Sequence, residues 1–554
     1  MRFSLSLLHD RIGRRAAAKV IWLAVALAFG IAHLWLTIGP QIVLASHPFW
    51  RSPPGDFATH TLGAEAFLRD PAWHFPLDVT ARLMSGGHPV AILFMDSAPW
   101  IAILAKAVQA DWLSVVGLTA ALSVILQPVS FVLLLLALGV RRWQSLVVGT
   151  ALGSLLPAWY MRLGMHVALS SHWLPVLALA LAVKATRQGL SWGIVIGLAV
   201  LGAVAFGIHV YLFVMIAAIA LAALTIDVFR FGRPAAKRAG IGVALFVSLS
   251  AISAWTLVYG ATGGVSGFGY YSMNLASPFF PQNSGILKAI VGSPGAVIDA
   301  TGGQYEGFNY LGAGILVCLV AAACIFLRKR PQDRNWRPAL PLILTLSMLA
   351  LFATSNVIFF RSVPIMIFPL PPSFIAELEP FRASGRMFWP VAYMLLAWSL
   401  MLIDALPSSR TATIILVGAL LAQAIDTAPA RNTLRKRFQS SSGVTFDTRP
   451  LRQIATLRFI PAYACTNPAD AEASQVALVV ERAGGRVEDG PIGRLDPRVC
   501  DPMVRAPQFA GRSPGTRNLL IVNGLSDDVI QRWKRSSHCV PLGHNLLCGA
   551  NPNE

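Results

Sequence analysis

The chain has 554 residues, of which 55% are hydrophobic and only 13% are charged, and its formal net charge is +19. Soluble proteins carry roughly 25% charged residues, so this composition argues against a water-soluble enzyme, and it excludes a disordered chain, which needs low hydrophobicity. A nucleic-acid-binding protein would gather its positive charge in one patch, whereas the basic residues here are spread along the chain. The composition predicts a membrane protein.

Hydrophobic runs recur up to about residue 430, and each is close to the ~20 residues that a helix needs to cross ~30 Å of hydrocarbon. Strands of a membrane barrel would alternate in polarity over about ten residues, whereas 132–137 reads Val-Leu-Leu-Leu-Leu-Ala without a break. We therefore predict an all-α polytopic fold with about eleven transmembrane helices. The expected spans are 20–44, 113–140, 144–161, 171–185, 190–206, 210–228, 240–260, 309–327, 338–355, 387–404 and 411–428.

The first hydrophobic run follows a basic stretch and could be mistaken for a secretory signal peptide. Its length exceeds the roughly 7–15 residues of a signal-peptide core, so we interpret it as a retained signal anchor. An N-terminus on the cytoplasmic side then places nineteen basic and four acidic residues in the cytoplasmic segments, against nine basic and ten acidic residues in the opposite loops up to residue 428. This is the asymmetry of the positive-inside rule, and an odd number of spans places the C-terminus outside.

The composition changes at about residue 429. The segment 429–554 holds seventeen basic and eleven acidic residues and has no long apolar run. Strand-like stretches at 476–480 and 518–522 and a possible helix at 526–535 predict a small α+β domain. We therefore divide the chain into a membrane domain, 1–428, which includes the long external loop 45–112, and an extracytoplasmic domain, 429–554.

Four of the six cysteines lie in this tail, at Cys465, Cys500, Cys539 and Cys548. An even number of cysteines in a small domain indicates two disulfides in an oxidising compartment, with three pairings open. The alternative is four unpaired cysteines in a cytoplasmic tail.

The first external loop, 45–112, contains the first candidate catalytic residues. A helix that starts after Gly55 would put Asp56 and His60 on one face, and 97–110 is expected to be a short helix at the membrane interface. Asp56 could deprotonate a hydroxyl group or bind a cation, and Asp96 precedes Ser97 and Pro99. The alternative for both acids is a helix N-cap or a turn.

The second external region, the loop 261–308 and the first residues of the span after it, is rich in aromatic, amide and glycine residues. Aromatic rings with hydroxyl and amide groups suit the stacking and hydrogen bonding of sugars, although they also form aromatic belts at the bilayer interface. Glu306 lies among these aromatic residues beside a span, where an acid needs a partner. The candidate sugar-binding residues are Tyr270, Tyr271, Tyr305 and Tyr310.

A third external region contains Arg382 and Arg386, which would point the same way from a helix. Two arginines at the outer end of a span do not follow the positive-inside rule, and guanidinium groups can clamp a phosphate. The alternatives are pairing with Glu377 or Glu379 and binding to lipid headgroups.

Further candidate substrate-binding residues lie at breaks between spans. Polar residues at this depth in a membrane protein are candidates for function, and the alternative is a structural role at the helix break. No phosphate-binding loop and no HExxH motif occurs in the sequence, and repeated halves are not visible. These additional candidates are Arg162, His166, His172, His209 and Tyr211.

The layout resembles the GT-C class of membrane glycosyltransferases, and more closely an uncharacterised family of bacterial multi-pass proteins with that layout. The resemblance extends over nearly the whole membrane part, and the order of its motifs along one side of the membrane carries it. These motifs are Gly55-Asp56, Trp73-His-Phe-Pro76, Asp96-Ser-x-Pro99, His166 with His172-Trp173, His209-x-Tyr211, Tyr305-Glu-Gly-Phe308 with Tyr310-Leu-Gly, and Arg382-Ala-Ser-Gly-Arg386.

The resemblance implies a hexosyl or pentosyl transferase in the bacterial inner membrane, with its C-terminal domain in the periplasm. It implies a polyprenyl-phosphate-linked sugar donor and a glycan, lipid or protein acceptor of the cell envelope, with no nucleic acid. Asp56 matches the usual base, while Asp96 and Glu306 would orient the acceptor or hold a cation. Because Phe57 replaces the second acid of an acidic pair, a Mg²⁺ or Mn²⁺ cofactor stays open, with Asp56 and Glu306 as candidate ligands. The alternatives are a transporter or flippase for lipid-linked carbohydrate and an envelope assembly scaffold.

Overall fold

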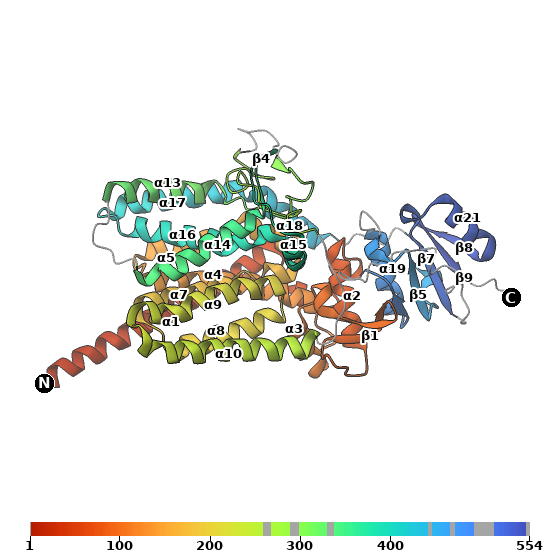
Figure 1. Ribbon diagram of the computed structural model, residues 1–554, viewed down its shortest axis with the longest axis horizontal. Coiled ribbons are helices and arrows are strands. Elements are labelled where there is room, and N and C mark those ends of the chain that lie inside the picture. Colours follow the sequence, from red (N-terminus) through yellow and green to blue (C-terminus); the bar gives the residue numbers. More distant parts are fainter. Residues whose placement is uncertain are drawn as a thin grey trace.

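The computed structural model describes residues 2–258, 267–287, 298–329, 337–440, 446–465, 471–491 and 515–549. A bundle of long helices occupies one end of the molecule, and a β-sheet with its covering helices occupies the other (Figure 1). The start of α1 and the sheet lie at opposite ends of the long axis. The two ends of the bundle are therefore called here the α1-start end and the sheet end.

Every predicted span contains an α-helix. In the described part of the chain, eight helices are long and apolar enough to cross a membrane, or up to nine if the pair α5 and α6, bent by 45°, is one span. The two further predicted spans, α8 and α13, are shorter apolar helices. The helices of the bundle are α1 (Arg2–Thr37), α4 (Val115–Leu138), α5 (Trp143–Gly153), α6 (Pro157–Leu163), α7 (Trp173–Gln188), α8 (Trp192–Phe206), α9 (Val210–Phe231), α10 (Arg233–Val258), α13 (Ala313–Lys329), α14 (Leu340–Thr354), α16 (Trp389–Asp404) and α17 (Ser409–Asp426).

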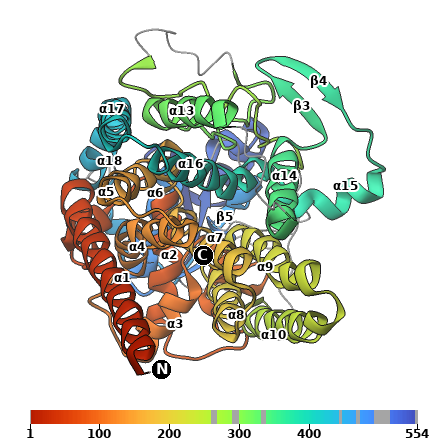
Figure 2. The same ribbon diagram turned by 90° about the vertical axis from the view of Figure 1, so that its left-hand side faces the viewer.

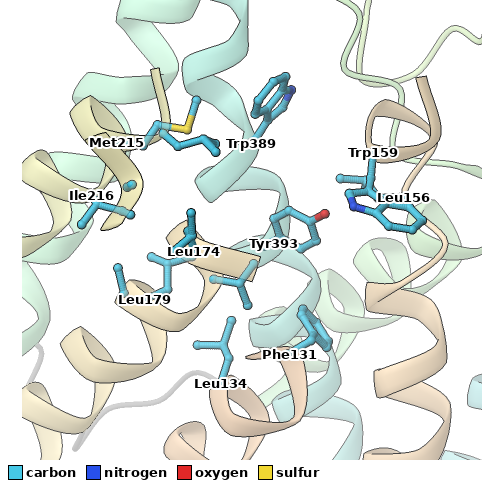
Figure 3. Close-up of a cluster of buried hydrophobic side chains, with 14 of the residues drawn as sticks. Phe131, Leu134, Leu156, Trp159, Leu174, Leu179, Met215, Ile216, Trp389 and Tyr393 are labelled. Carbon is cyan, nitrogen blue, oxygen red and sulfur yellow. The ribbon is translucent and has the colours of Figure 1, made fainter. Parts of the chain in front are cut away.

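The core of the bundle is apolar and lies mainly between α4, α7, α9 and α16 (Figure 3). Phe131 of α4, Leu179 of α7 and Met215 of α9 are fully buried there, and Tyr393 of α16 is buried among them. Apolar side chains on the outer surfaces of the helices stay exposed, because lipid replaces water as their solvent.

Short elements connect the spans at the sheet end. They are α2 (Asp56–Arg69), α3 (Pro99–Ala107), α15 (Pro372–Leu378), α18 (Ala428–Gln439) and the hairpin of β3 (Val357–Phe360) and β4 (Val363–Ile367). This hairpin and α15 project sideways from α14, beyond the ring of bundle helices (Figure 2).

The sheet has seven strands in the order β2-β1-β6-β5-β7-β9-β8. Two of them, β1 and β2, come from the first external loop. They join the strands of the tail where β1 pairs in parallel with β6 through Leu83 and Val487. The strands are β1 (Val79–Ser85), β2 (His88–Ala91), β5 (Thr456–Ile460), β6 (Arg486–Glu488), β7 (Thr516–Leu520), β8 (His538–Leu542) and β9 (Asn545–Gly549).

The secondary structure predicted for the tail is correct except at one stretch. The helix expected at 526–535 is α21 (Asp527–Ser536), and most of 518–522 lies in β7. The stretch 476–480 is helical, within α19 (Ala471–Arg482), and so the predicted strand there is wrong. Ala473, Val476, Ala477 and Val480 are buried, and their spacing of three to four residues forms one apolar face of a helix.

The external loop and the tail are held together by ion pairs as well as by the shared sheet. Glu481 of α19 is fully buried and accepts from Arg69 Nη1 (2.5 Å) and Arg82 Nε (2.9 Å). Its neighbour Arg482 binds Glu65 of α2 at 2.7 Å. The polar surfaces of α2 and β1 therefore dock against α19.

A disulfide joins Cys539 to Cys548 across β8 and β9, which confirms one of the predicted disulfides. Cys465 is also disulfide-bonded, and Cys500 lies outside the described residues.

Candidate functional site

Helix α2 carries the first acid of the site. Gly55, with φ of 54°, is the N-cap of this helix, and Asp56 is its first residue. The predicted helix is confirmed, whereas the alternative of Asp56 as N-cap is wrong, because Gly55 holds that position. The side chain of Asp56 is 46% exposed, and His60, one turn later, is buried.

The second acid, Asp96, lies in a tight turn against α2. Its φ is 53°, in the left-handed region, and it ends a 3₁₀ helix, whereas the N-cap of α3 is Ala98. The turn approaches α2 at Gly63, where a Cβ atom would come within 2.6 Å of Ser97 Oγ. Ser97 Oγ donates to the backbone oxygen of His60 at 2.8 Å. The missing side chain of Gly63 therefore lets Asp96 face the same side of α2 as His60.

His166 lies at the centre of the site. Its Nδ1 is 3.1 Å from Asp96 Oδ2, and its Nε2 is 3.6 Å from Asp56 Oδ2 and 3.7 Å from Glu306 Oε1. Three acids from separate segments of the chain thus converge on one imidazole.

Two more histidines contact Asp96. His209 Nδ1 accepts from the backbone N–H of Tyr211 at 3.1 Å, so its Nε2 carries the proton and donates to Asp96 Oδ1 at 3.2 Å. His60 Nε2 lies 3.7 Å from Asp96 Oδ2. Burial alone would raise the pKa of Asp96, but His209 and the hydrogen bonds from His166 and His209 outweigh it and hold that pKa well below its usual range. Burial lowers the pKa of His60 to about 4 despite the nearby Asp96, so His60 is neutral at pH 7.

Glu306 was expected to need a partner, and it has two, which are arginines of the bundle. Arg162 Nη1 donates to Glu306 Oε2 at 2.6 Å, and Arg386 Nη2 donates to the same oxygen at 2.7 Å. Burial would raise the pKa of Glu306, but the two guanidinium groups hold it well below its usual range. Arg162 also packs over the ring of Trp389, 5.7 Å from the ring centroid.

Arg382 and Arg386 differ in their partners. They do not share an α-helix: Arg386 lies in the 3₁₀ helix Ser384–Phe388, and Arg382 precedes it. The helical interpretation is therefore wrong, because the backbone leaves the α-region at Ala383 (φ −94°, ψ 54°). Arg386 packs 4.9 Å from the ring centroid of Tyr211 and pairs with Glu306. Arg382 is exposed and forms no ion pair with any described residue, and Glu379 instead accepts from the backbone of Gly267.

Aromatic rings lie next to these arginines. Arg382 Cζ is 5.4 Å from the ring centroid of Tyr271, and this ring contacts those of Tyr270 (4.8 Å) and Tyr305 (6.1 Å). Tyr270 and Tyr305 are each more than 40% exposed. Burial, with Tyr271 and Glu306 nearby, raises the pKa of Tyr305 to about 12, so it stays a neutral hydrogen-bond donor.

A family model matches residues 26–428 of the chain and is described as a domain of unknown function, DUF6311. The chain belongs to this family. No curated protein matches the sequence. Among solved structures, the chain is similar to the crystal structure of ArnT from Cupriavidus metallidurans bound to undecaprenyl phosphate. The TM-score is 0.46 at 12% sequence identity, over 96% of this chain and 99% of that one.

Two of the residues of this DUF6311 protein that were predicted from the sequence lie away from the three acids around His166. His172 is fully buried, with Nδ1 3.0 Å from Tyr393 Oη and its ring 4.1 Å from that of Trp389. Tyr310 is fully buried and donates to Asp426 Oδ2 at 2.7 Å. Both side chains are therefore closed to a ligand.

The sequence reasoning missed two supporting residues. Trp389 provides the ring behind both Arg162 and His172, and the only signal for it is its place one turn after Arg386. Asp426 is buried at the sheet end of α17, where it accepts from Tyr310 and from the backbone N–H of Ala313. An acid at the end of an apolar helix is the signal for a buried network.

The site also contains groups that could hold a metal ion. His60, Asp96 and His166 offer ligand atoms that all lie within 4.8 Å of one another. The acids named from the sequence, Asp56 and Glu306, face Nε2 of the same His166 ring. Imidazole with carboxylate suits a transition-metal ion such as Mn²⁺ better than Mg²⁺, which prefers oxygen ligands.

A cavity of about 620 Å³ lies on another side of α2. Thr61, Glu65 and Arg69 of α2, the start of α4 and Arg482 of α19 line it, whereas Asp56, Asp96 and Glu306 do not. The cluster of acids around His166 is therefore separate from this cavity.

Proposed function

We propose that this DUF6311 protein is a glycosyltransferase of the bacterial inner membrane. It transfers a sugar from a polyprenyl-phosphate-linked donor to an acceptor hydroxyl group at the periplasmic face. The observation that supports this proposal is the convergence of Asp56, Asp96 and Glu306 on His166, with Arg382 exposed nearby beside a group of tyrosines.

Asp56 is the base in this proposal because it is the accessible acid. Glu306 is neutralised by two arginines, and Asp96 accepts from two histidines. Asp56 is 46% exposed, and its only described polar contact is the one with His166 at 3.6 Å. A carboxylate with free lone pairs at an open site can accept a proton.

The reaction then runs as a single displacement. The acceptor oxygen attacks the anomeric carbon and gives its proton to Asp56, while the bond between that carbon and the phosphate oxygen breaks, with inversion. Arg382 stabilises the departing lipid phosphate by charge-assisted hydrogen bonds. Arg386 acts beside it by holding Glu306 in place, and Tyr270, Tyr271 and Tyr305 bind the sugar. A Mn²⁺ ion at the His166 cluster would add positive charge beside the acceptor.

The first test is Asp56→Asn in the full-length chain in nanodiscs, supplied with polyprenyl-phosphate-linked hexoses and pentoses. The amide cannot accept the proton, so transfer is expected to fall by about a hundredfold or more, with the folded protein still present. The matched control is Asp447→Asn, since Asp447 is exposed and pairs with Arg449. Transfer retained by Asp56→Asn would contradict the role of this residue.

Arg382→Gln tests the phosphate contact. Loss of a charge-assisted hydrogen bond costs about 1.5–3 kcal/mol, so kcat/KM for the donor is expected to fall by roughly ten- to hundredfold. Arg449→Gln is the control, because it removes an exposed arginine of the tail that pairs with Asp447. It is expected to have no effect on kcat/KM. A wild-type protein that moves the lipid-linked sugar across the bilayer without transferring it would instead establish a flippase.

A further inference from the structure

The β3–β4 hairpin and α15 expose an unusually apolar surface. Seven large hydrophobic side chains of this segment are each at least 40% exposed: Phe360, Val363, Ile365, Met366, Ile367, Phe368 and Phe374. Soluble surfaces rarely expose so many neighbouring apolar groups unless another surface binds to them.

Both faces of β4 are exposed, whereas Ile358 of β3 is buried and the backbone oxygen of Phe359 accepts from the N–H of Leu275 at 2.9 Å. All five residues of β4 are exposed although alternate residues point to opposite faces, and in the described residues β4 pairs with β3 alone. A hairpin strand that exposes apolar side chains on both of its faces is only marginally stable in water. It therefore needs a surrounding medium that accepts apolar groups on both sides.

The position of the hairpin indicates which medium that is. β3 begins three residues after α14 ends, and α14 itself exposes Leu344, Met348 and Leu351 on its outer surface. The hairpin and α15 then project sideways from the bundle (Figure 2), while α15 lies at the sheet end of the spans (Figure 1). The space beside a membrane-spanning bundle, level with the ends of its helices, is the bilayer surface.

The charge and the backbone groups of the hairpin limit how deeply it can lie in the bilayer. Between residues 357 and 376, Arg361 is the single charged residue, and it lies exposed at the turn between the two strands. The outer edge of β4, which pairs with no other strand among the described residues, carries free N–H and C=O groups that cannot lie in the hydrocarbon core. They can bind water and headgroups at the boundary, where apolar side chains reach the acyl chains.

We propose that the β3–β4 hairpin and α15 form a membrane-surface anchor at the headgroup–acyl boundary of the leaflet on the sheet side. Apolar side chains of both strands enter the acyl region, and Arg361 meets lipid phosphates. This anchor is independent of the transferase proposal, and it holds the segment that leads into Arg382 at the membrane surface, where a lipid-linked substrate travels.

The test places an environment-sensitive fluorophore on the hairpin of the full-length chain in nanodiscs. Ile365→Cys and Met366→Cys, on opposite faces of β4, are labelled in a Cys324→Ser background, because Cys324 is an exposed free cysteine and Cys318 is buried. Arg449→Cys is the matched control at a site that is exposed and outside the bundle, and the parent without an added cysteine sets the background signal.

Lipids with a nitroxide near the headgroup are expected to quench most of the fluorescence at both hairpin positions and none at the control. Lipids with the nitroxide at the chain terminus are expected to quench the hairpin labels less. Unquenched, water-like emission at both hairpin positions would overturn the proposal. It would also be overturned if the labels were shielded from the nitroxides and the same cysteines, left unlabelled, formed disulfides between two copies of the chain, which would make the hairpin a dimer interface.

Discussion

Asp56, Asp96 and Glu306 carry the same charge but lie in different surroundings, and these surroundings separate their proposed roles. Asp96 and Glu306 are held by histidines and arginines at distances of 2.6–3.2 Å, so their charges are already compensated. Asp56 has only a longer contact with His166. The residue types were evident from the sequence, whereas the difference in accessibility depends on the packing around each side chain.

Asp78 allows a prediction at the same scale, because it is a buried acid with an incomplete set of partners. It is fully buried, Oδ2 accepts from Leu93 N–H at 3.0 Å, and no group among the described residues donates to Oδ1. Burial raises its pKa to about 7, although the N–H of Leu93 acts against the rise. Since the carboxyl is more acidic in the unfolded chain, the folded state loses stability as the pH rises from about 4 to 7.

Asp78→Asn removes this ionisation. The stability of the variant relative to the wild type is expected to increase by about 3 kcal/mol between pH 5 and pH 8, because about two pH units of this range lie below the pKa of about 7, at about 1.4 kcal/mol per unit. Thermal unfolding of the full chain across this pH range measures the difference. The exposed Asp528→Asn is the control, with a small effect expected throughout. A difference that does not change with pH would show that Asp78 keeps its ordinary acidity.

At the scale of elements, the first external loop and the tail form one sheet, and a charged seam joins them. This seam consists of the ion pairs of Glu481 with Arg69 and Arg82. Leu62 and Ala66 of α2 share a core with Val476 and Val480 of α19, and Glu481 binds two arginines of the loop. The loop that carries Asp56 is therefore braced by the tail. This bracing explains how a long loop can hold the proposed base, Asp56, in a defined place.

Glu481→Gln tests the bracing. Removing one partner of a buried ion pair leaves uncompensated charge and costs roughly 3–5 kcal/mol, so the unfolding midpoint of the full chain is expected to fall markedly. Glu488→Gln is the control, because Glu488 binds Arg458 in a partly exposed pair, which contributes about 1 kcal/mol or less. Equal effects of the two variants would argue against a seam that depends on Glu481.

At the scale of the whole molecule, the distribution of charge predicts how the protein sits in the membrane. The segments assigned to the cytoplasm hold nineteen basic residues against four acidic ones. The start of α1 and the sheet lie at opposite ends of the long axis (Figure 1). Both observations agree with a cytoplasmic N-terminus and an external sheet, which is the side where the cysteines can oxidise.

Reporter fusions measure this orientation. Alkaline phosphatase fused after the last residue is expected to be active, and green fluorescent protein at the same point is expected to be dark. A chain that ends after α16, at Asp404, is expected to show the reverse pattern. Fluorescence of the full-length fusion without phosphatase activity would place the sheet in the cytoplasm.

The sequence by itself determined the membrane fold, because a long apolar run in lipid must satisfy its backbone hydrogen bonds within a helix. It also indicated the helix that begins at Asp56 and nearly all of the polar residues of the site, since such residues are conspicuous in an apolar chain. Only the tertiary structure decided which of them meet. Glu306 binds Arg162, 144 residues away, β1 pairs with β6 of the tail, and His172 and Tyr310 turn into the interior. These pairings depend on how distant segments pack, and no local pattern of residues encodes such packing.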